Sequence, residues 1–419
     1  MKFNTYSISE LIDEIAMGPF GSNIKVECFV DDGIPVLNGS NLNGFFLTED
    51  SFRYVTETKA DSLGRANAHR GDIVITHRGT LGQIVCIPET SKYDRYVISQ
   101  SQFRVKCNEK VLPEYLVYYF HTAIGQHKLL SNASQVGVPA LARASTTFQK
   151  IEVEIPDIKT QQKVVSVLNA IEAKINVNRS INDNLQQQAE TLFNYWFTQY
   201  NFPDCEGRPY KSAGGTMVWN NELNDNIPDN WAIGNLYDIA GFINGLACQK
   251  YRPKASEKSM PVVKIREMHD GITKDTELVS TTIPKKNVLA NGDILFSWSA
   301  TLEVMYWYGG KAGLNQHIFK VVPLNGFPKE YVYHQLSAYV YKFVKMAEAR
   351  KTTMGHITAD HIQQSCIAIP PVELLKDFSE ALNPIHQKMG QCQIENRKLT
   401  MLRNWLLPML MNGQATIED

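Results

Sequence analysis

Gly71-Asp72-Ile73-Val74, followed by Thr80-Leu81, returns 221 residues later as Gly292-Asp293-Ile294-Leu295, followed by Thr301-Leu302. Further matches flank this pair: Ile8 and Leu11 with Ile233 and Leu236, Ile34-Pro35-Val36 with Met260-Pro261-Val262, Gln100, Phe103 and Tyr115 with Gln316, Phe319 and Tyr331, and Ile155-Pro156 with Ile369-Pro370. Their separation drifts in small steps, as expected when insertions fall in surface loops. The chain therefore contains one internal duplication.

Each half has the same predicted order of short strands followed by helices. In the first half, residues 74–76 and 84–87 read as strands around the turn Gly79-Thr80-Leu81-Gly82. Residues 294–296 and 304–307 occupy the equivalent places. Apolar residues then recur at helical spacing over 115–126 and 331–345, so each globular part is predicted to be α+β.

A long helix is predicted after each globular part. Mostly apolar residues recur at alternating steps of four and three residues, at positions 164, 168, 171, 175, 178, 182, 185, 189, 192 and 196. We call this row of positions the seam of the helix. A second seam runs from Phe378 to Leu410, with each position 214 residues after its equivalent in the first. This is the pattern of a left-handed coiled coil, over about 36 residues or roughly 54 Å. The alternative is that each amphipathic helix covers only its own domain.

We expect the two helices to pack as an antiparallel coiled coil that separates two globular domains. The predicted boundaries are 1–159 for the first domain, 160–199 for the first helix, 200–230 for a linker rich in Gly and Pro, 231–373 for the second domain, 374–412 for the second helix and 413–419 for a tail. Asn182 and Asn396 share a seam position. A buried Asn pair fixes register, so we hypothesise that these two residues meet.

Composition indicates a globular protein of a reducing compartment. Hydrophobic residues make up 43% of the 419 residues, no apolar run is long enough for a signal peptide or a spanning helix, and the seven cysteines never form a CxxC pair. We expect a cytoplasmic protein without a membrane partner or a structural zinc site. The net charge of −1 restricts any nucleic-acid surface to a local patch, such as the basic residues between Lys250 and Arg266, which also fit an ordinary solvated face.

Motifs of catalysis and metal binding are missing from the sequence. We find no phosphate-binding loop, no Asn/Asp-Pro-Pro-aromatic string of an amino-methyltransferase, no HExxH and no deaminase signature. The chain is therefore expected to have no catalytic residues, metal or cofactor of its own.

The duplicated order of motifs closely resembles the specificity subunits of Type I restriction-modification systems. The resemblance covers nearly the whole chain and is carried by the two Gly-Asp-Ile strings, the domain endings Ile151-Glu152-Val153-Glu154-Ile155-Pro156 and Cys366-Ile367-Ala368-Ile369-Pro370-Pro371, and the helix openings Gln161-Gln162-Lys163-Val164 and Leu375-Lys376-Asp377-Phe378. It implies that each domain recognises one half of a split, asymmetric sequence in double-stranded DNA, and that the helices set the gap between the halves.

The resemblance also implies partners. Two methyltransferase (modification) subunits would dock on the helices, and nuclease-translocase (restriction) subunits would complete the assembly. S-adenosylmethionine, ATP and magnesium would be bound by those partners, and adenine methylation and DNA cleavage would be their chemistry.

Candidate DNA contacts come from strand-end loops, because base edges are best read by paired donors and acceptors. In the first domain they are Asn38, Ser40, Asn41, Thr76, His77, Arg78, Gln100, Gln102 and, for phosphate, Arg143. In the second domain they are Lys264, Arg266, Ser297, Trp298, Ser299, Gln316, His317 and, for phosphate, Lys351. Asn38 and Asn41 could instead be turn formers, and Trp298 could be a core residue rather than a platform for an everted base.

Two other functions remain open from the sequence. One is the specificity module of a related fused restriction-methylation enzyme. The other, from a different class, is a coiled-coil scaffold that carries two binding modules and never contacts DNA. Salt-dependent DNA binding would separate the scaffold from both DNA-reading alternatives.

Overall fold

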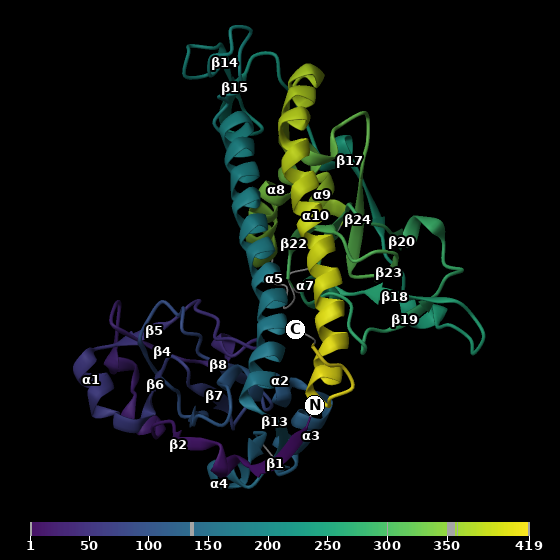
Figure 1. Cartoon of the computed structure of the whole chain (residues 1–419). Helices are drawn as coiled ribbons and strands as arrows, with labels where there is room; N and C mark the ends of the chain where they lie inside the picture. The colour runs from purple at the N-terminus through teal and green to yellow at the C-terminus, as the bar shows by residue number, and fades with distance from the viewer. Residues whose placement is uncertain (1, 135–137, 300, 350–356, 358, 418–419) are drawn as a thin grey trace. The chain divides into compact units, whose positions relative to one another are not determined.

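The structure, a computed structural model, describes residues 2–134, 138–299, 301–349, 357 and 359–417. The chain forms two compact units, Met1–Ala173 with Leu399–Asp419, and Lys174–Lys398. Each unit contains one α+β domain and a stretch of both long helices, α5 (Ile158–Phe193) and α10 (Val372–Met411). The ribbon is drawn in Figure 1.

The first domain is built on three main sheets, antiparallel or mixed, and one further short strand pair. The strands are β1 (Phe3–Ser7) paired with β13 (Glu152–Pro156); the four-stranded order β2 (Ile12–Met17), β10 (Gln102–Cys107), β7 (Ile73–Thr76), β8 (Ile84–Cys86); and the five-stranded order β3 (Phe29–Val30), β5 (Arg53–Val55), β4 (Ile34–Val36), β9 (Arg95–Val97), β6 (Asn67–His69). Its helices are α1 (Glu57–Ser62), α2 (Pro113–His121), α3 (Ala123–Leu130) and α4 (Ala144–Gln149), and β11 (Ala133–Ser134) pairs with β12 (Ala140–Leu141).

The second domain repeats the main strand orders of the first, but β3 and the β11–β12 pair have no counterpart among its described strands. Its sheets are β16 (Ala232–Gly234) with β25 (Ile367–Ile369); β17 (Ala240–Asn244), β24 (Ile318–Pro323), β21 (Asp293–Ser297), β22 (Glu303–Trp307); and β19 (Leu278–Ser280), β18 (Ser259–Val263), β23 (Ala312–Leu314), β20 (Val288–Leu289). Its helices are α6 (Leu236–Ile239), α7 (Ile265–Asp270), α8 (Lys329–Ala349) and α9 (Ala359–Gln363). Even the single parallel pair recurs, as β4 with β9 and β18 with β23. The predicted duplication and α+β class are confirmed.

Apolar residues of the predicted helical seam are buried or half-buried in each unit. In the first unit, Val164 and Leu168 of α5 share a core with Leu410 of α10. In the second unit, the seam residue Trp196, in the turn after α5, packs against Phe378 of α10, and Asn178 of α5 hydrogen-bonds Asn396. Early residues of α5 therefore meet late residues of α10, and α5 and α10 form an antiparallel pair in each unit.

The register of this pair corrects one prediction. Asn396 Oδ1 accepts a hydrogen bond from Asn178 Nδ2 at 2.9 Å, and Asn396 Nδ2 donates to the carbonyl of Ile175 at 3.1 Å, whereas Asn182 Oδ1 is buried without a partner among the described residues. The prediction that Asn182 meets Asn396 is therefore wrong by one helical turn of α5. Asn178 and Asn182 are one helical turn apart on the same side of α5, and the register of the two helices brings Asn396 to the first of them.

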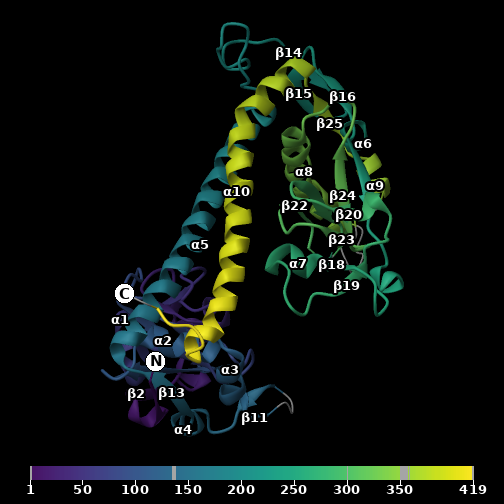
Figure 2. The ribbon, with the colours of Figure 1, turned by 45° about the vertical axis from the view of Figure 1, so that its right-hand side comes forward.

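In the second unit the domain is joined to α10 through α8. Helix α8 lies between strands β22 and β24 on one side and α10 on the other (Figure 2). A π-helical turn (Asn194–Thr198) follows α5 and contributes Trp196 and Phe197 to the same core. The segment predicted as a linker, 200–230, carries the hairpin β14 (Met217–Asn220) and β15 (Asp225–Pro228).

Candidate nucleic-acid interface

Loops from four strands converge at one edge of the first domain. We call them loop cluster 1: residues 18–28 after β2, 38–43 after β4, 77–83 after β7 and 99–101 before β10. Backbone bonds tie them together, because Gly18 N donates to Gln102 O at 2.8 Å and His77 N donates to Ser101 O at 2.8 Å. The convergence places most first-domain candidates in one surface region.

The second domain forms the same arrangement, loop cluster 2: residues 245–252, 264–277, 298–299 and 315–317. Gly245 N donates to Ile318 O at 3.2 Å, and Trp298 N donates to His317 O at 3.3 Å, at positions matched to those of the first domain. A Cβ at Gly18 would overlap the carbonyl oxygen of Ser99, and a Cβ at Gly245 would overlap that of Asn315. Both glycines are therefore required by close approach of two backbones.

Each Gly-Asp-Ile string forms the turn before the strand, β7 or β21, that leads into the loop cluster of its domain. Gly71 and Gly292 have φ of 82° and 85°, in the region that favours glycine, and each following Asp caps the turn by accepting a backbone N–H. Asp72 then pairs with Arg104 at 3.3 Å, and Asp293 pairs with Lys320 at 2.7 Å. Burial is the main cause of a raised pKa at Asp72, and the guanidinium of Arg104 opposes it. These aspartates are scaffold groups.

The structure corrects the prediction for three first-domain candidates, Asn41, Thr76 and Gln102, which are buried. Asn41 accepts from the backbone N–H of Asn38 at 2.9 Å and donates twice to loop carbonyls. Thr76 donates to Gln83, and Gln102 accepts from Ser99 N. Buried backbone groups need partners, and these side chains provide them.

Ser297 and Ser299 of the second domain are also buried. The hydroxyl of Ser297 donates to the carbonyl of Thr301 and accepts from Glu303 N at 3.2 Å. It closes the β21–β22 turn, so its hydroxyl is unavailable to a base edge. The correction for Ser297 has the same cause as in the first domain, and Ser299 is corrected on its burial.

The exposed candidates of the first domain are Ser40, Arg78, Gln100 and Arg143. Arg78 makes no ion pair with any described residue, and its backbone forms a bridge to Ala140. Arg143 has a positive φ of 47° as it enters α4. Asn38 is half-buried and caps the turn that presents Ser40, with Oδ1 accepting from Ser40 N at 2.8 Å.

His77 is held at the tip of β7. Its Nε2 lies 3.1 Å from the carbonyl of Gln100, and its ring packs beside Phe103. Partial burial lowers the pKa of His77. A neutral imidazole bonded to that carbonyl donates from Nε2, so Nδ1 is left as an acceptor.

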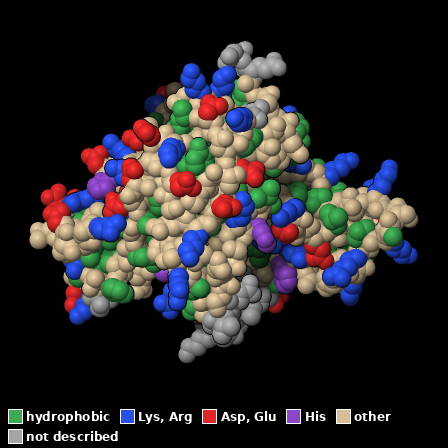
Figure 3. Space-filling view, turned by 60° about the horizontal axis from the view of Figure 1, so that its bottom comes forward, with side chains coloured by type: hydrophobic (Ala, Val, Ile, Leu, Met, Phe, Trp, Pro, Cys, Tyr) green, Lys and Arg blue, Asp and Glu red, His purple; other side chains and the backbone are tan. Residues whose placement is uncertain are grey.

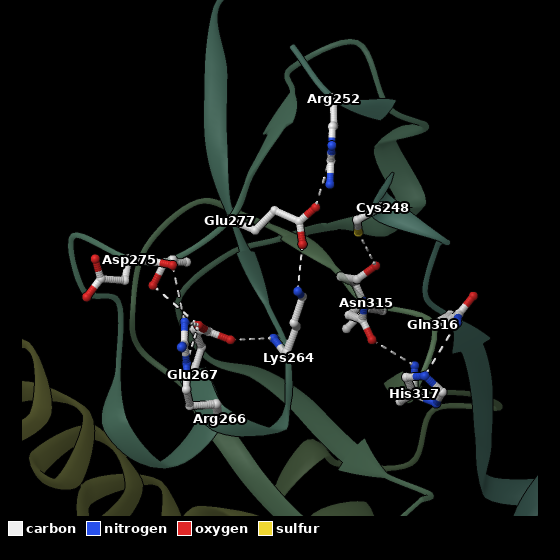
Figure 4. A network of polar contacts seen from close by, with 12 residues as sticks. Cys248, Arg252, Lys264, Arg266, Glu267, Asp275, Glu277, Asn315, Gln316 and His317 are labelled. Atoms are coloured by element: carbon white, nitrogen blue, oxygen red, sulfur yellow. Dashed lines mark hydrogen bonds and ion pairs between the residues drawn. The ribbon is translucent and has the colours of Figure 1, made fainter. Parts of the chain in front are cut away.

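A network of polar contacts organises loop cluster 2 (Figure 4). Lys264 pairs with Glu277 at 2.6 Å, and Arg266 pairs with Glu267 at 2.6 Å. The ammonium group of Lys264 lowers the pKa of Glu277, and the hydrogen bond to Glu267 raises the pKa of Arg266. Glu267, which sequence reasoning did not single out, is the buried carboxylate that pairs with Arg266 in this network. The sequence did carry a sign of this role, because Glu267 stands three residues after the strand-end residue Lys264, where a helix-capping side chain is expected.

Gln316, His317 and Trp298 line the other side of loop cluster 2. Gln316 Nε2 lies 3.4 Å from His317 Nε2, and the ring of Trp298 packs on His317 and Phe319. Trp298 is half-buried and packs against the core of the second unit. Lys351 lies outside the described residues.

Basic and acidic side chains are interspersed over most of the face shown in Figure 3. Lys250, Lys254 and Lys258 are exposed, and their ammonium groups form no ion pair with described residues. Phe20 in loop cluster 1 is 83% exposed, which sequence reasoning missed. No described group of three or more His, Cys, Asp or Glu could hold a metal, and none of the described helices is long and apolar enough to cross a bilayer.

Comparisons with known proteins agree on one family. The family model for the Type I restriction modification DNA specificity domain matches twice, over residues 20–187 and 228–395. The chain is 23% identical over 426 residues to the Type I restriction enzyme MjaIX specificity subunit of Methanocaldococcus jannaschii, covering 97% of this chain and 92% of that protein. It is 22% identical over 378 residues to the HindI specificity subunit of Haemophilus influenzae, covering 77% and 82%.

A solved structure has a similar fold. The S subunit of a Type I restriction-modification system from M. genitalium matches with a TM-score of 0.54 at 12% identity, covering 100% of this chain and 97% of that one. The two family matches fall on the two halves of the duplication and together cover most of the chain. The chain therefore belongs to the family of Type I restriction-modification DNA-specificity proteins.

Proposed function

We propose that this chain reads a bipartite, asymmetric DNA site, with one half-site recognised by each loop cluster. The observation that carries the proposal is a contrast at matched positions of one scaffold. Ser40 corresponds to Arg266, Asn38 to Lys264, and Ser101 to His317, while the caps beneath them keep their roles. Two homologous domains that read different half-sites are expected to share the backbone scaffold and its capping residues, and to differ in the donors and acceptors they present to the bases.

The exposed and half-buried candidates divide by role. Ser40, Arg78 and Gln100 would contact bases of the first half-site, and Arg143 would contact phosphate. Lys264, Arg266, Gln316 and His317 would serve the second half-site, together with phosphate contacts from Lys250 and Lys254. The unpaired ammonium groups supply the local basic patch that a net charge of −1 requires.

The paired helices would set the gap between half-sites and dock the partners. Helix α5 has 36 residues and α10 has 40, about 54 and 60 Å at 1.5 Å per residue. We propose that two methyltransferase subunits dock on this pair and that nuclease-translocase subunits complete the complex. S-adenosylmethionine, ATP and magnesium would be bound by those subunits, and this chain would contribute recognition without a catalytic group.

The test is single-molecule sequencing of methylated adenine in a host carrying the chain and its partner subunits. We expect two methylated adenines, one on each strand, within a bipartite motif. Arg78→Ala should alter only the first half-site and Arg266→Ala only the second. A continuous palindromic motif, or one substitution that alters both halves, would contradict the proposal.

A DNA-binding measurement separates this proposal from the scaffold alternative. The complex of this chain with methyltransferase subunits should bind duplex DNA with an affinity that falls steeply as salt rises. Binding of equal strength at low and high salt, or no binding, would support a scaffold that does not contact DNA.

A further inference from the structure

We propose that Arg266 reads a guanine in the second half-site and that Glu267 is the positioning residue that aims its guanidinium group. The inference rests on the proposed function, since it assumes that loop cluster 2 faces DNA. It adds a base identity and a residue that the duplication and the family match do not assign.

The geometry of Glu267 is that of a buried clamp. Its side chain is 1% exposed, and its Oε1 accepts from Arg266 Nε at 3.0 Å and Nη2 at 2.6 Å (Figure 4). Its Oε2 accepts from Lys264 N at 3.2 Å, and the hydroxyl of Thr276 lies 3.4 Å from Oε1. The carboxylate is thereby fixed between the start of α7 and the following loop.

Arg266 is held by one edge and open on the other. Its side chain is 54% exposed, and its Nη1 has no hydrogen-bond partner among the described residues, while the second N–H of Nη2 makes a long contact of 3.4 Å with the carbonyl of Asp275. The planar guanidinium group has donors on two edges, so the edge with Nη1 and Nη2 becomes available to a ligand that displaces this long contact. Two parallel donors match O6 and N7 of guanine in the major groove, which is the commonest specific contact of arginine.

The first domain shows that the cap does not require a carboxylate. Asn41 occupies the position of Glu267, is equally buried, and accepts from Asn38 N at 2.9 Å through a neutral amide. The residue before it is Ser40 instead of Arg266. A buried carboxylate is costly unless a cation pairs with it, so Glu267 and Arg266 are best explained as a unit.

The charges of the network favour a base contact over a phosphate contact. Lys264 and Arg266 are each matched by a carboxylate, and Asp270 and Asp275 lie close enough to Arg266 to raise its pKa further. A cluster without excess positive charge attracts phosphate weakly, whereas the unpaired ammonium group of Lys250 attracts it strongly. Loss of Arg266 should therefore change which sequence is read more than the salt dependence of binding.

The experiment uses the chain in complex with its methyltransferase subunits and compares methylated motifs and binding to matched duplexes. In Arg266→Ala, preference for guanine at one position of the second half-site should fall about 10- to 100-fold, with the first half-site unchanged. Arg266→Lys, which loses the paired donors, should relax the same position. Glu267→Gln should relax it by a smaller factor, because the neutral amide can still cap α7 but holds the guanidinium group less firmly.

The control for folding is the double variant R266S/E267N, which installs the Ser40-Asn41 pair of the first domain. It should melt close to the unmodified chain and lose the same guanine preference. The control for charge is Lys250→Ala, which should weaken binding to all sequences and lower the salt slope by about one without changing the motif.

The outcomes separate the two proposals. Retention of the guanine preference in both Arg266→Ala and R266S/E267N, or a uniform loss of affinity like that of Lys250→Ala, would overturn the assignment of Arg266. An unchanged motif in Glu267→Gln would remove Glu267 as positioning residue. If the unmodified complex methylates no bipartite motif, the proposed function itself fails.

Discussion

In each unit, a cluster of side chains joins the α+β domain to its stretch of α5 and α10. We call this cluster the seat of the domain, and the two seats differ in chemistry at equivalent positions. In the first unit, Tyr118 donates to Asn169 at 2.8 Å, and Glu172 of α5 pairs with Arg403 of α10 at 2.6 Å. The guanidinium group of Arg403 also lies 4.9 Å from the centre of the Phe45 ring. This seat is polar and charged.

In the second unit the equivalents of Tyr118 and Glu172 are His334 and His386. Both are buried, their Nε2 atoms lie 3.1 Å apart, and the rings of Tyr306 and Tyr333 pack around them. Desolvation lowers the pKa of His334 to about 3 and that of His386 to about 4. The comparison teaches that equivalent positions of one backbone arrangement accept an ion-paired carboxylate or a member of a neutral imidazole pair, the latter with His386 Nδ1 buried without a hydrogen-bond partner among the described residues.

The largest expected difference between the seats is their response to acid. The folded pKa values of both histidines lie below the ordinary value of 6.5, so the unfolded chain binds more protons in this range. Their contribution to stability is complete above pH 6.5 and is lost as pH falls toward 4. Between pH 7 and pH 5 each histidine should cost about 2 kcal/mol of unfolding free energy.

Urea unfolding followed by tryptophan fluorescence at the two pH values measures this loss. Five of the six tryptophans lie in the second unit, so the signal reports mainly on it. His386→Gln should reduce the acid loss, although Glu330 and Lys329 also face this site and act in opposite directions. Equal acid sensitivity of the unmodified chain and the His386→Gln variant would show that the two histidines are not held in the neutral form in the folded protein.

The charged seat of the first unit should instead be destabilised by removing the side chain of one member of its ion pair. Arg403→Ala leaves the carboxylate of Glu172 buried without its cation and should lower unfolding free energy by about 4 kcal/mol. Adding Glu172→Gln should recover a large part of the loss, because no buried charge remains. Chemical denaturation measures both variants, and a double variant no more stable than Arg403→Ala would contradict the role of the ion pair.

The smallest effect concerns the two asparagines of α5. Asn178 bonds Asn396 and Glu395, whereas Asn182 Oδ1 has no partner among the described residues. Asn182→Leu should therefore be neutral or stabilise by about 1 kcal/mol, and Asn178→Leu should destabilise by about as much. The register can be read separately, since cysteines at 178 and 396 should crosslink on oxidation and cysteines at 182 and 396 should not.

Loop residues show why the site was less predictable than the fold. Asn41 and Ser40 are neighbours of similar polarity, yet one is buried as a cap and the other is exposed. Which of them faces outward depends on carbonyls contributed by Thr48 and Asp50, further along the chain. The role of Glu267 likewise depends on its contact with Thr276.

The sequence by itself determined the duplication, the Gly-Asp-Ile strand entries and the paired helical seams, because these are short-range patterns that set backbone conformation and hydrophobic faces. Only the tertiary structure decided that Asn396 meets Asn178, that Thr76, Gln102, Ser297 and Ser299 are buried, and that Glu267 is buried against Arg266. Register and side-chain exposure arise from contacts between segments distant in the chain, so no local pattern encodes them.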